Sequence, residues 1–431
     1  MGIDVSIIMP SLNVIRYIED CIKSVLSQTM ENIEIICVDA GSTDGTLEII
    51  QKYAIMDKRI RVIHSDKKSY GYQINMGIKA SHGTYIGIVE TDDTIEADMF
   101  EQLYSFALKY HVDIVKSDFW GVVGETYEEK KHYHMLEKKE DYHRCLSFQD
   151  NYNVLPVDMI ATWSGIYRKD FLIQNSIWHN ETPGASYQDT GFSMLAFMYS
   201  KSIYFTDQCF YHYRMDNPDS SVYAKNKTYC ICDEFEFIKN KMEADPALDE
   251  YRDLFCRFFY KKYKRNLERI QKEEIEKFLE KFQNDFCMLF ENRWIQWESW
   301  EKEEREDLKL ILDTGSKYLQ EILERRRIFL QEILSTDGVI IYGAGVWGKR
   351  VFQDIADETK VICFAQTNAP EVDWMFMEKP VLAIAQLEQY TDHTTVVIAV
   401  KNKVQKKMMR NQAEKLGFRK VVELPYGLYD F

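Results

Sequence analysis

Residues 5–39 read VSIIMPSLNVIRYIEDCIKSVLSQTMENIEIICVD, and this stretch decides the fold class. Its beginning (VSIIMP) and its end (IEIICVD) are mostly apolar, which is typical of buried strands. Between them, residues 15–28 carry apolar side chains at helical spacing and predict a helix with one buried face. The apolar face of that helix consists of Ile18, Ile22, Val25 and Leu26. A strand, a helix and a second strand in this order predict a parallel βαβ unit.

The same alternation continues along the chain. Residues 59–65 and 85–90 predict a third and a fourth strand, and residues 73–81 predict a short helix between them. This order is typical of a doubly wound α/β sheet, in which ligands bind at the carboxyl ends of the strands. Asp39 and residues 90–93 each follow a predicted strand. The sequence therefore predicts a binding site at this edge of the sheet.

Changes of pattern divide the chain into three predicted parts. Residues 1–222 hold the first α/β pattern, which becomes less regular after about residue 110. Residues 223–335 are charged and helical, with apolar side chains three to four apart and few glycines or prolines. Residues 336–431 begin with a strand, a glycine turn and a helix (GVIIYGAGVWGKR) and predict a small second α/β domain.

Composition excludes several classes of protein. The chain has 431 residues, 45% of them hydrophobic, and a formal net charge of -15, which argues against a general nucleic-acid binder. It contains no apolar run long enough to span a membrane and no secretory signal pattern at its start. Its nine cysteines are scattered without a C-x-x-C pair, so reduced thiols in a cytoplasmic protein are expected.

The stretch IVETDD ends a buried strand with three carboxylates, Glu90, Asp92 and Asp93. Carboxylates this close repel one another and are costly to desolvate together, and a divalent cation is the usual compensation. Mg²⁺ or Mn²⁺ prefers oxygen ligands and is often held by one or two carboxylates together with substrate phosphates. The cluster therefore predicts a metal–diphosphate site. The alternative is a solvated acidic turn that caps the helix over residues 95–108.

The ordered motifs VSIIMPSLN, IEIICVDAGSTDG and GYQINMGIKASHGTYIGIVETDD resemble the family 2 glycosyltransferases, which have the GT-A fold. The resemblance covers roughly residues 3–220. It implies a mixed GT-A sheet, a uridine diphosphate sugar as donor, Mn²⁺ or Mg²⁺ as cofactor, and transfer with inversion. The acceptor implied is a glycan or a lipid-linked glycan in the synthesis of a cell-surface polysaccharide such as a capsule.

The resemblance also implies which residues form the site. Asp39 would meet the nucleotide base, although Ala40 stands where the family often has a second aspartate. Asp92 would bind the metal, Asp93 would bind it through water or hold the loop, and Glu90 replaces the aspartate usual at the first place of the motif. His212 is a candidate third metal ligand. The implied nucleotide-binding residues are Pro10, Ser11, Asn13, Asp39, Gln73, Asn75, Thr91 and Arg214.

A general base is expected in the stretch ASYQDTGFSMLAF. The family has an acidic pair before an aromatic helix, and here the pair is Gln188 and Asp189. A positioned carboxylate can take the proton from an attacking acceptor hydroxyl, so Asp189 is the predicted catalytic base. The alternative is that Asp189 is the N-cap of the helix that follows. Trp163 and Trp178 are candidates for stacking on a sugar ring, or for packing.

Two features of the C-terminal half leave alternatives open. Gly343, Gly345 and Gly348 match the dinucleotide fingerprint, but no acid follows in residues 366–368, at the end of the next predicted strand. We expect a Rossmann-like domain used for interaction, such as homo-oligomer formation, or for an unidentified ligand. The alternative enzyme is a dinucleotide-dependent oxidoreductase or epimerase that uses this glycine loop, and the non-enzyme alternative is a scaffold whose transferase half has decayed.

The helical part contains residues 257–271, where lysine, arginine and aromatic side chains alternate on a predicted helix. Such a helix can lie on an anionic membrane, so peripheral contact with the inner face of the plasma membrane is one interpretation. Inward packing of its aromatic side chains is the other. Residues 294, 297 and 300 are tryptophans, predicted to share one helical face with the same two readings.

Overall fold

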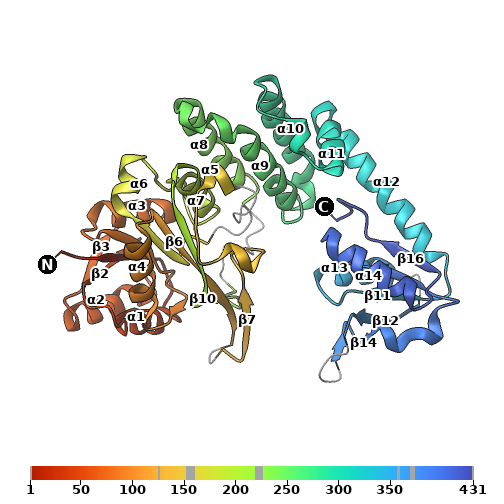
Figure 1. Cartoon of the computed structure of the whole chain (residues 1–431), viewed down its shortest axis with the longest axis horizontal. Coiled ribbons are helices and arrows are strands. Elements are labelled where there is room, and N and C mark those ends of the chain that lie inside the picture. The colour runs from red at the N-terminus through yellow and green to blue at the C-terminus, as the bar shows by residue number, and fades with distance from the viewer. Residues whose placement is uncertain are drawn as a thin grey trace. The chain divides into compact units, whose positions relative to one another are not determined.

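The computed structural model describes residues 2–124, 127–151, 161–218, 227–356, 360–368 and 374–429. The chain divides into two compact units, Met1–Lys262 and Tyr263–Phe431 (Figure 1). The division falls inside helix α9 (Arg252–Leu267), so helix α8 (Cys230–Ala244) belongs to the first unit. The boundaries predicted near residues 222 and 335 divide the chain more finely and stay predictions.

The first unit contains a mixed sheet with the strand order β3-β2-β1-β4-β9-β6-β10-β5. Strands β1 to β4 are parallel, whereas β9 runs antiparallel to both β4 and β6. Strand β7 pairs with β6, and β8 pairs with β10. The strands are β1 (Val5–Ser11), β2 (Ile33–Asp39), β3 (Ile60–His64), β4 (Tyr85–Ile88), β5 (Thr94–Ile95), β6 (Ile114–Val123), β7 (Glu129–Tyr133), β8 (Cys145–Leu146), β9 (Gly165–Arg168) and β10 (Ile203–Arg214). The predicted doubly wound, mixed α/β sheet is confirmed.

Helices alternate with the strands of this sheet. Every residue of β1 and β2 is buried, which explains their nearly continuous apolar sequences. The short helices η1 (Lys139–Asp141) and η3 (Pro246–Tyr251) are of the 3-10 type. The α-helices before α8 are α1 (Ile18–Leu26), α2 (Thr46–Met56), α3 (Tyr70–Ala80), α4 (Met99–Tyr110), α5 (Phe148–Asn151), α6 (Lys169–Gln174) and α7 (Gln188–Tyr199).

Local chemistry explains where α3 begins and how it packs. The helix starts at Tyr70, earlier than predicted, because the Ser69 hydroxyl caps it by accepting a hydrogen bond from the Tyr72 backbone N–H at 3.2 Å. At Gly77, an added Cβ would lie 2.5 Å from Cγ2 of Ile8 on β1. Glycine therefore allows α3 to pack closely onto the centre of the sheet, and this fixes the segment that precedes the helix.

The second unit has a helical region followed by a second sheet, as predicted. The sheet order is β13-β14-β12-β11-β15-β16, and only β13 is antiparallel to its neighbour among the described strands. Its strands are β11 (Val339–Tyr342), β12 (Val361–Gln366), β13 (Trp374–Phe376), β14 (Lys379–Ala383), β15 (Thr395–Ile398) and β16 (Lys420–Glu423). Its helices are α10 (Ile275–Glu291), α11 (Lys302–Asp313), α12 (Gly315–Leu334), α13 (Val346–Ile355) and α14 (Lys403–Lys415), with 3-10 helices η4 (Lys272–Glu274), η5 (Trp297–Ser299) and η6 (Ile384–Tyr390).

The aromatic side chains of α9, which contains most of residues 257–271, pack inside the protein. Phe255 and Phe259 of α9 contact Phe235 of α8, with ring centroids 5.1 and 5.4 Å apart. Further along α9, Tyr263 packs against Phe278 and Phe282 of α10. These contacts favour the packing interpretation of residues 257–271. Among the described residues, no helix has the length and apolarity needed to cross a membrane.

The prediction that three tryptophans share a helical face is wrong. Helix α10 ends at Glu291 and α11 begins at Lys302, so Trp294, Trp297 and Trp300 lie in the connection between them. The indole rings of Trp297 and Trp300 pack together at 5.9 Å, and Trp294 and Trp300 are buried. Their spacing of three reflects a folded connection that packs its large side chains inward.

Candidate active site

A cavity of about 780 Å³ opens at the carboxyl ends of the strands in the first unit. Its wall is built from the residues after β1, the turn after β2, the start of α3, the residues after β4, and the segment that leads into α7. This is the edge where a doubly wound sheet is expected to bind its ligand. The predicted site residues at this wall are Pro10, Ser11, Asn13, Gln73, Glu90, Thr91, Asp92 and Asp189.

Glu90 lies in the cavity wall and is held by two tyrosines. Its carboxylate accepts a hydrogen bond from the Tyr70 hydroxyl at 2.6 Å, and its backbone N–H donates to the Tyr211 hydroxyl at 3.0 Å. Burial, opposed by the Tyr70 hydrogen bond and reinforced by the Asp92 and Asp189 carboxylates, raises the pKa of Glu90 to about 8. The protonated form of Glu90 is therefore more favoured than that of an exposed glutamate.

Asp92 lines the same wall, half-buried. One of its carboxylate oxygens accepts a hydrogen bond from the Asn217 side chain at 2.7 Å. Its backbone carbonyl accepts a bond from the guanidinium of Arg214 at 3.2 Å. Asp92 therefore presents a carboxylate to the cavity in a fixed orientation, as a ligand for a hard cation should.

Asp93 is buried behind the cavity wall instead. Its Oδ1 accepts the Arg214 backbone N–H at 2.7 Å, whereas Oδ2 is buried with no hydrogen-bond partner among the described residues. Burial, and then the Asp92 carboxylate, raise the pKa of Asp93 well above its ordinary value. Of the two roles predicted for Asp93, these contacts correspond to holding the loop.

His212 lies away from the cavity wall. Along β10, alternate residues point to opposite faces of the sheet, so His212 and Arg214 face away from Tyr211 and Tyr213. The His212 ring nitrogens lie 3.0 Å from a Glu96 carboxylate oxygen and 3.3 Å from the Thr94 hydroxyl. Burial and the nearby ammonium of Lys130 lower the pKa of His212. The structure does not bring His212 together with Asp92 as a shared ligand set.

The predicted nucleotide residues divide into cavity-lining and buried groups. The loop after β1 is tied across the sheet edge, because the Thr91 hydroxyl donates to the Pro10 carbonyl at 2.8 Å. The amide of Gln73 donates to the carbonyls of Ser11 and Val38 at 2.9 and 2.6 Å, which holds the ends of β1 and β2 together. Arg214 lies outside the lining, with its guanidinium 4.9 Å from the ring centroid of Tyr17.

Asp39 and Asn75 are engaged inside the fold. The two oxygens of Asp39 accept four hydrogen bonds, from the backbone N–H groups of Gly41 and Ser42 and from the hydroxyls of Ser11 and Ser42. A carboxylate offers about four lone-pair sites, so Asp39 has none left for a base in this arrangement. Asn75 exchanges hydrogen bonds with the backbone of His179. Their predicted contacts with a nucleotide stay predictions.

Asp189 lies in the first turn of α7 and lines the cavity. The N-cap of the helix is Tyr187, so the alternative that Asp189 is the N-cap is wrong. Burial raises the pKa of Asp189, while the charge of Lys262 and the backbone N–H of Thr190 oppose that shift. Gln188 also lines the cavity, but its side-chain amide donates to the Thr182 hydroxyl at 2.9 Å and the Gly184 carbonyl at 3.2 Å, which holds the loop before α7.

An aromatic stack forms one side of the cavity. Trp163 stacks on Tyr211 and Tyr213, with ring centroids 4.2 and 5.2 Å apart, and both Trp163 and Tyr213 line the cavity. The turn that carries Trp163 is held by the buried amino group of Lys116, which donates to the carbonyl of Thr162 at 3.3 Å. Trp178, in contrast, lies outside the lining, with the Lys79 ammonium 5.3 Å from its ring.

Sequence reasoning missed several residues that shape this site. Tyr70 and Asn217 position the two carboxylates of the wall, and Lys116 positions Trp163. None of them stands in a motif with a readable spacing, because each acts across at least 20 residues of sequence. The cationic side chains in the lining are Arg16, Lys68 and Lys227.

The glycine turn of the second unit has the geometry its sequence predicts. Gly343 has a φ of +128°, and Gly345 is the N-cap of α13. A Cβ at Gly348 would lie 1.9 Å from the carbonyl oxygen of Gly343, so only glycine allows this close approach. Strand β12 ends at Gln366, and the Thr367 hydroxyl after it lies 3.0 Å from the Tyr342 hydroxyl. No acidic side chain is present at this strand end in residues 360–368.

Comparison with known proteins relates the first unit to a family of transferases. The sequence model of glycosyl transferase family 2 matches residues 6–174. The chain is 34% identical over 220 residues to the uncharacterized glycosyltransferase EpsJ of Bacillus subtilis (strain 168), which covers 50% of this chain and 62% of EpsJ. It is 38% identical over 118 residues to the glycosyltransferase GlyG of Streptococcus pneumoniae serotype 4, which covers 27% of this chain and 39% of GlyG. The chain thus spans less than two thirds of the length of each relative.

A solved structure shows the same fold. Crystalline S. aureus TarS 1-349 in complex with UDP-GlcNAc superposes with a TM-score of 0.58 and 18% identity, over 74% of this chain and 88% of that chain. At this identity the likeness concerns the fold alone. Together with the matched family model and the relatives, these observations lead to one conclusion: residues 6–174 form a glycosyltransferase domain of the family 2 type, and the first unit has the GT-A fold.

Proposed function

We propose that this protein transfers a sugar from a UDP-sugar to a hydroxyl of a saccharide or lipid-linked glycan, with inversion at the anomeric carbon and Asp189 as general base. The observation that carries the proposal is that Asp92 and Asp189, almost a hundred residues apart in sequence, line one cavity at the carboxyl edge of the sheet. Two carboxylates in one cavity with different surroundings suit two different tasks, ligand binding and proton transfer.

The UDP-sugar part of the proposal rests on the family and on the charges of the cavity. The crystallised TarS complex contains UDP-GlcNAc, and TarS shares the fold of this chain. Arg16, Lys68 and Lys227 line the cavity and supply positive charge for a diphosphate. Ser11 and Asn13, at the end of β1 and in the loop that follows, offer polar groups at the same wall.

The residues at the wall fit a hard divalent cation. Asp92 offers a half-buried carboxylate held in place by Asn217, and the neighbouring Glu90 carboxyl has a pKa raised to about 8, so an added cation would favour its ionised form. Oxygen ligands of this kind are those that Mg²⁺ and Mn²⁺ prefer. When bound, such a cation neutralises charge on the leaving diphosphate. Asp92 is the proposed ligand, with Glu90 close by.

The reaction needs a base and a leaving group. Asp189 accepts the proton of the acceptor hydroxyl while that oxygen forms a bond to the anomeric carbon and the bond from this carbon to the UDP oxygen breaks. The pKa of Asp189 is raised by burial, which makes its carboxylate a stronger base than an exposed aspartate. The flat stack of Trp163 and Tyr213 at the cavity is suited to hold the apolar face of an acceptor sugar.

The two alternatives have less support. A dinucleotide-dependent enzyme in the second unit lacks an acid for the ribose at the end of β12 within residues 360–368. A decayed scaffold would be favoured if the cavity had lost its ionisable groups. Instead, Glu90, Asp92 and Asp189 all line it.

Calorimetric titration of the full chain with UDP, GDP and NADH, with and without Mn²⁺, tests the proposal. We expect UDP to bind, and Mn²⁺ to strengthen that binding by about tenfold or more. Asp92→Asn should remove the Mn²⁺ effect, whereas Asp20→Asn on the exposed side of α1 should retain it. No detectable binding of UDP or GDP, or binding of NADH instead of UDP, would overturn the proposal.

A further inference from the structure

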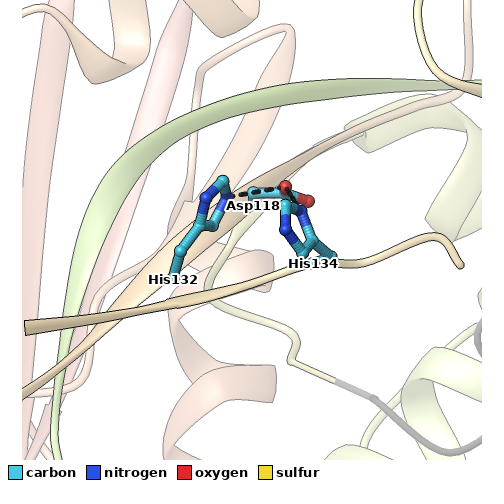
Figure 2. Close-up of side chains that lie close together, drawn as sticks. All are labelled: Asp118, His132 and His134. Atoms are coloured by element: carbon cyan, nitrogen blue, oxygen red, sulfur yellow. Dashed lines mark hydrogen bonds and ion pairs between the residues drawn. The ribbon is translucent and has the colours of Figure 1, made fainter. Parts of the chain in front are cut away.

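A second group of metal-ligating side chains lies in the same unit, outside the cavity wall. Asp118 on β6, His132 on β7 and His134 directly after β7 point toward one another (Figure 2). None of the three lines the cavity that holds Asp92 and Asp189. Among the described residues, this is the one group that brings three potential ligand atoms within 4.8 Å of one another.

The pairing of two antiparallel strands creates this group. Trp120 lies opposite His132 in the ladder, and Phe119 lies opposite Tyr133, so Asp118 lies next to the position of His134. Residues two apart on a strand share a face, so His132 and His134 project to the same side as Asp118. The arrangement therefore depends on strand register, and a shift of one residue would separate the three side chains.

Distances and burial give the group the features of a metal centre. Asp118 Oδ2 lies 2.9 Å from Nε2 of His132 and 2.8 Å from Nδ1 of His134. Asp118 Oδ1 accepts hydrogen bonds from the Tyr142 hydroxyl at 2.6 Å and the Met135 backbone N–H at 2.8 Å. One carboxylate oxygen is thus anchored by the protein, and the other faces both imidazoles, as in sites where surrounding hydrogen bonds orient a ligand.

The donor atoms select the kind of metal. Two imidazole nitrogens with one carboxylate suit Zn²⁺ and related transition metals, whereas Mg²⁺ prefers oxygen ligands alone. Bonds of about 2.0–2.1 Å in a tetrahedron separate ligand atoms by about 3.3 Å, so the two N–O separations would open by roughly half an ångström. The side chains of His132 and His134 are 32% and 53% exposed, so solvent can deliver the ion and complete its coordination.

We propose that Asp118, His132 and His134 bind one Zn²⁺-class ion, separate from the cation proposed at Asp92. Strand β7 pairs with β6 alone among the described strands, and the Tyr142 contact connects the group to the chain that follows it. The ion therefore cross-links the β6–β7 pair at a position outside the donor cavity. Its role is to stabilise this part of the fold, because a ligand that binds only the folded state raises its stability.

The test uses the full chain without a histidine tag, freed of metal by a chelator. After addition of Zn²⁺ and removal of the excess by gel filtration, we expect one Zn²⁺ per chain by elemental analysis and a higher unfolding temperature than in the metal-free protein. The double variant His132→Gln/His134→Gln should retain less than about a tenth of that Zn²⁺ and show no thermal shift. The matched control His143→Gln removes a half-exposed histidine that pairs with Asp207 instead, and it should behave like the wild type.

Two further measurements separate this Zn²⁺ site from the site at Asp92 and test it without a variant. Asp92→Asn should retain the Zn²⁺, so loss of UDP binding and loss of Zn²⁺ binding remain separable. One equivalent of Co²⁺ on the wild type should give the visible absorption of a four-coordinate site with nitrogen ligands, a readout that needs no variant to fold. Equal Zn²⁺ retention by the double histidine variant, or a wild type that retains none, would overturn the proposal, and so would a Co²⁺ spectrum of six-coordinate aqueous type.

Discussion

The two α/β sheets of this chain share an architecture and differ in what stands at their strand ends. In the first unit, the residues after β4 carry Glu90 and Asp92, and both line a cavity. In the second unit, β11 leads into the turn of Gly343 and Gly345, and β12 ends at Gln366. A doubly wound sheet provides an edge where ligands can bind, but only side chains supply acids, bases and metal ligands.

The two sheets also differ in how the fold stabilises groups that are costly to bury. Carboxylates at a buried edge are retained where neighbours hold them: Tyr70 bonds to Glu90, and Asn217 bonds to Asp92. At the second sheet, Gly348 instead packs closely against the Gly343 carbonyl, which is possible because glycine has no side chain. Three experiments test this contrast between the two units.

Asp189→Asn should lower kcat by about 10²–10⁴-fold, because an amide cannot accept the acceptor proton. The affinity for UDP should stay within about twofold, since the base acts on the acceptor hydroxyl. Measurement of UDP release with a panel of UDP-sugars and acceptors, together with titration of UDP, checks both. Asp170→Asn, which changes an exposed acid in the first turn of α6, is the matched control. Undiminished transfer by Asp189→Asn would rule out this base.

Gly348→Ala should destabilise the second unit by about 1–3 kcal/mol, because its Cβ would lie 1.9 Å from the Gly343 carbonyl oxygen. UDP affinity should not change, since the cavity proposed to bind UDP belongs to the first unit. Gly345→Ala is the control, because an added Cβ there meets nothing within 4 Å and its φ is -133°. Chemical denaturation followed by hydrogen exchange measures the stability of each unit. Loss of UDP binding in folded Gly348→Ala would mean that UDP binds in the second unit.

The third experiment concerns a pH dependence of stability that comes from Glu234. This residue of α8 is fully buried beside Gly191 of α7, and burial raises its pKa to about 9 from an ordinary value of 4.5. Above pH 4.5 the unfolded chain loses this proton while the folded chain keeps it, so the stability falls as pH rises toward 9. The slope is at most about 1.4 kcal/mol per pH unit.

Glu234→Gln should flatten this dependence, because glutamine has no proton to lose. Glu236→Gln, at a partly exposed position of the same helix, should leave the slope unchanged. Denaturant unfolding of both variants at pH 6, 7 and 8, with the wild type beside them, is the measurement. Equal slopes in all three proteins would mean that Glu234 does not titrate between the folded and unfolded states.

Much of the fold could be predicted because its signals are local. The apolar runs of residues 5–10, 33–39, 59–65 and 85–90 are the strands β1 to β4, within a residue or two. Each run is bounded by polar residues and is too short for a helix, so local pattern is enough. The apolar pattern predicts a start of α3 at residue 73, later than Tyr70, because the Ser69 cap lies outside that pattern. The spacing of the tryptophans after α10 predicts one helical face, whereas they lie in a folded connection that the same spacing also fits.

The site could be predicted only in part. Asp92 and Asp189 stand in motifs, and both line the cavity. Asp39 stands in a motif too, yet its carboxylate is used up by Ser11 and the turn at Gly41 and Ser42. The direction in which a strand-end side chain points depends on the neighbours that pack around it. Those neighbours come from other segments, so no local pattern reveals them.

The sequence alone was enough to predict the order of the first strands and helices, a binding site at the carboxyl edge of their sheet, and a resemblance to the family 2 glycosyltransferases. Only the tertiary structure decided which polar side chains face the cavity, which are consumed inside, and that Asp118 meets His132 and His134. The physical reason is the range of the forces involved. The periodicity of strands and helices depends on residues that are close in sequence. Desolvation, hydrogen bonding and the proximity of charges depend on residues that only the fold brings together.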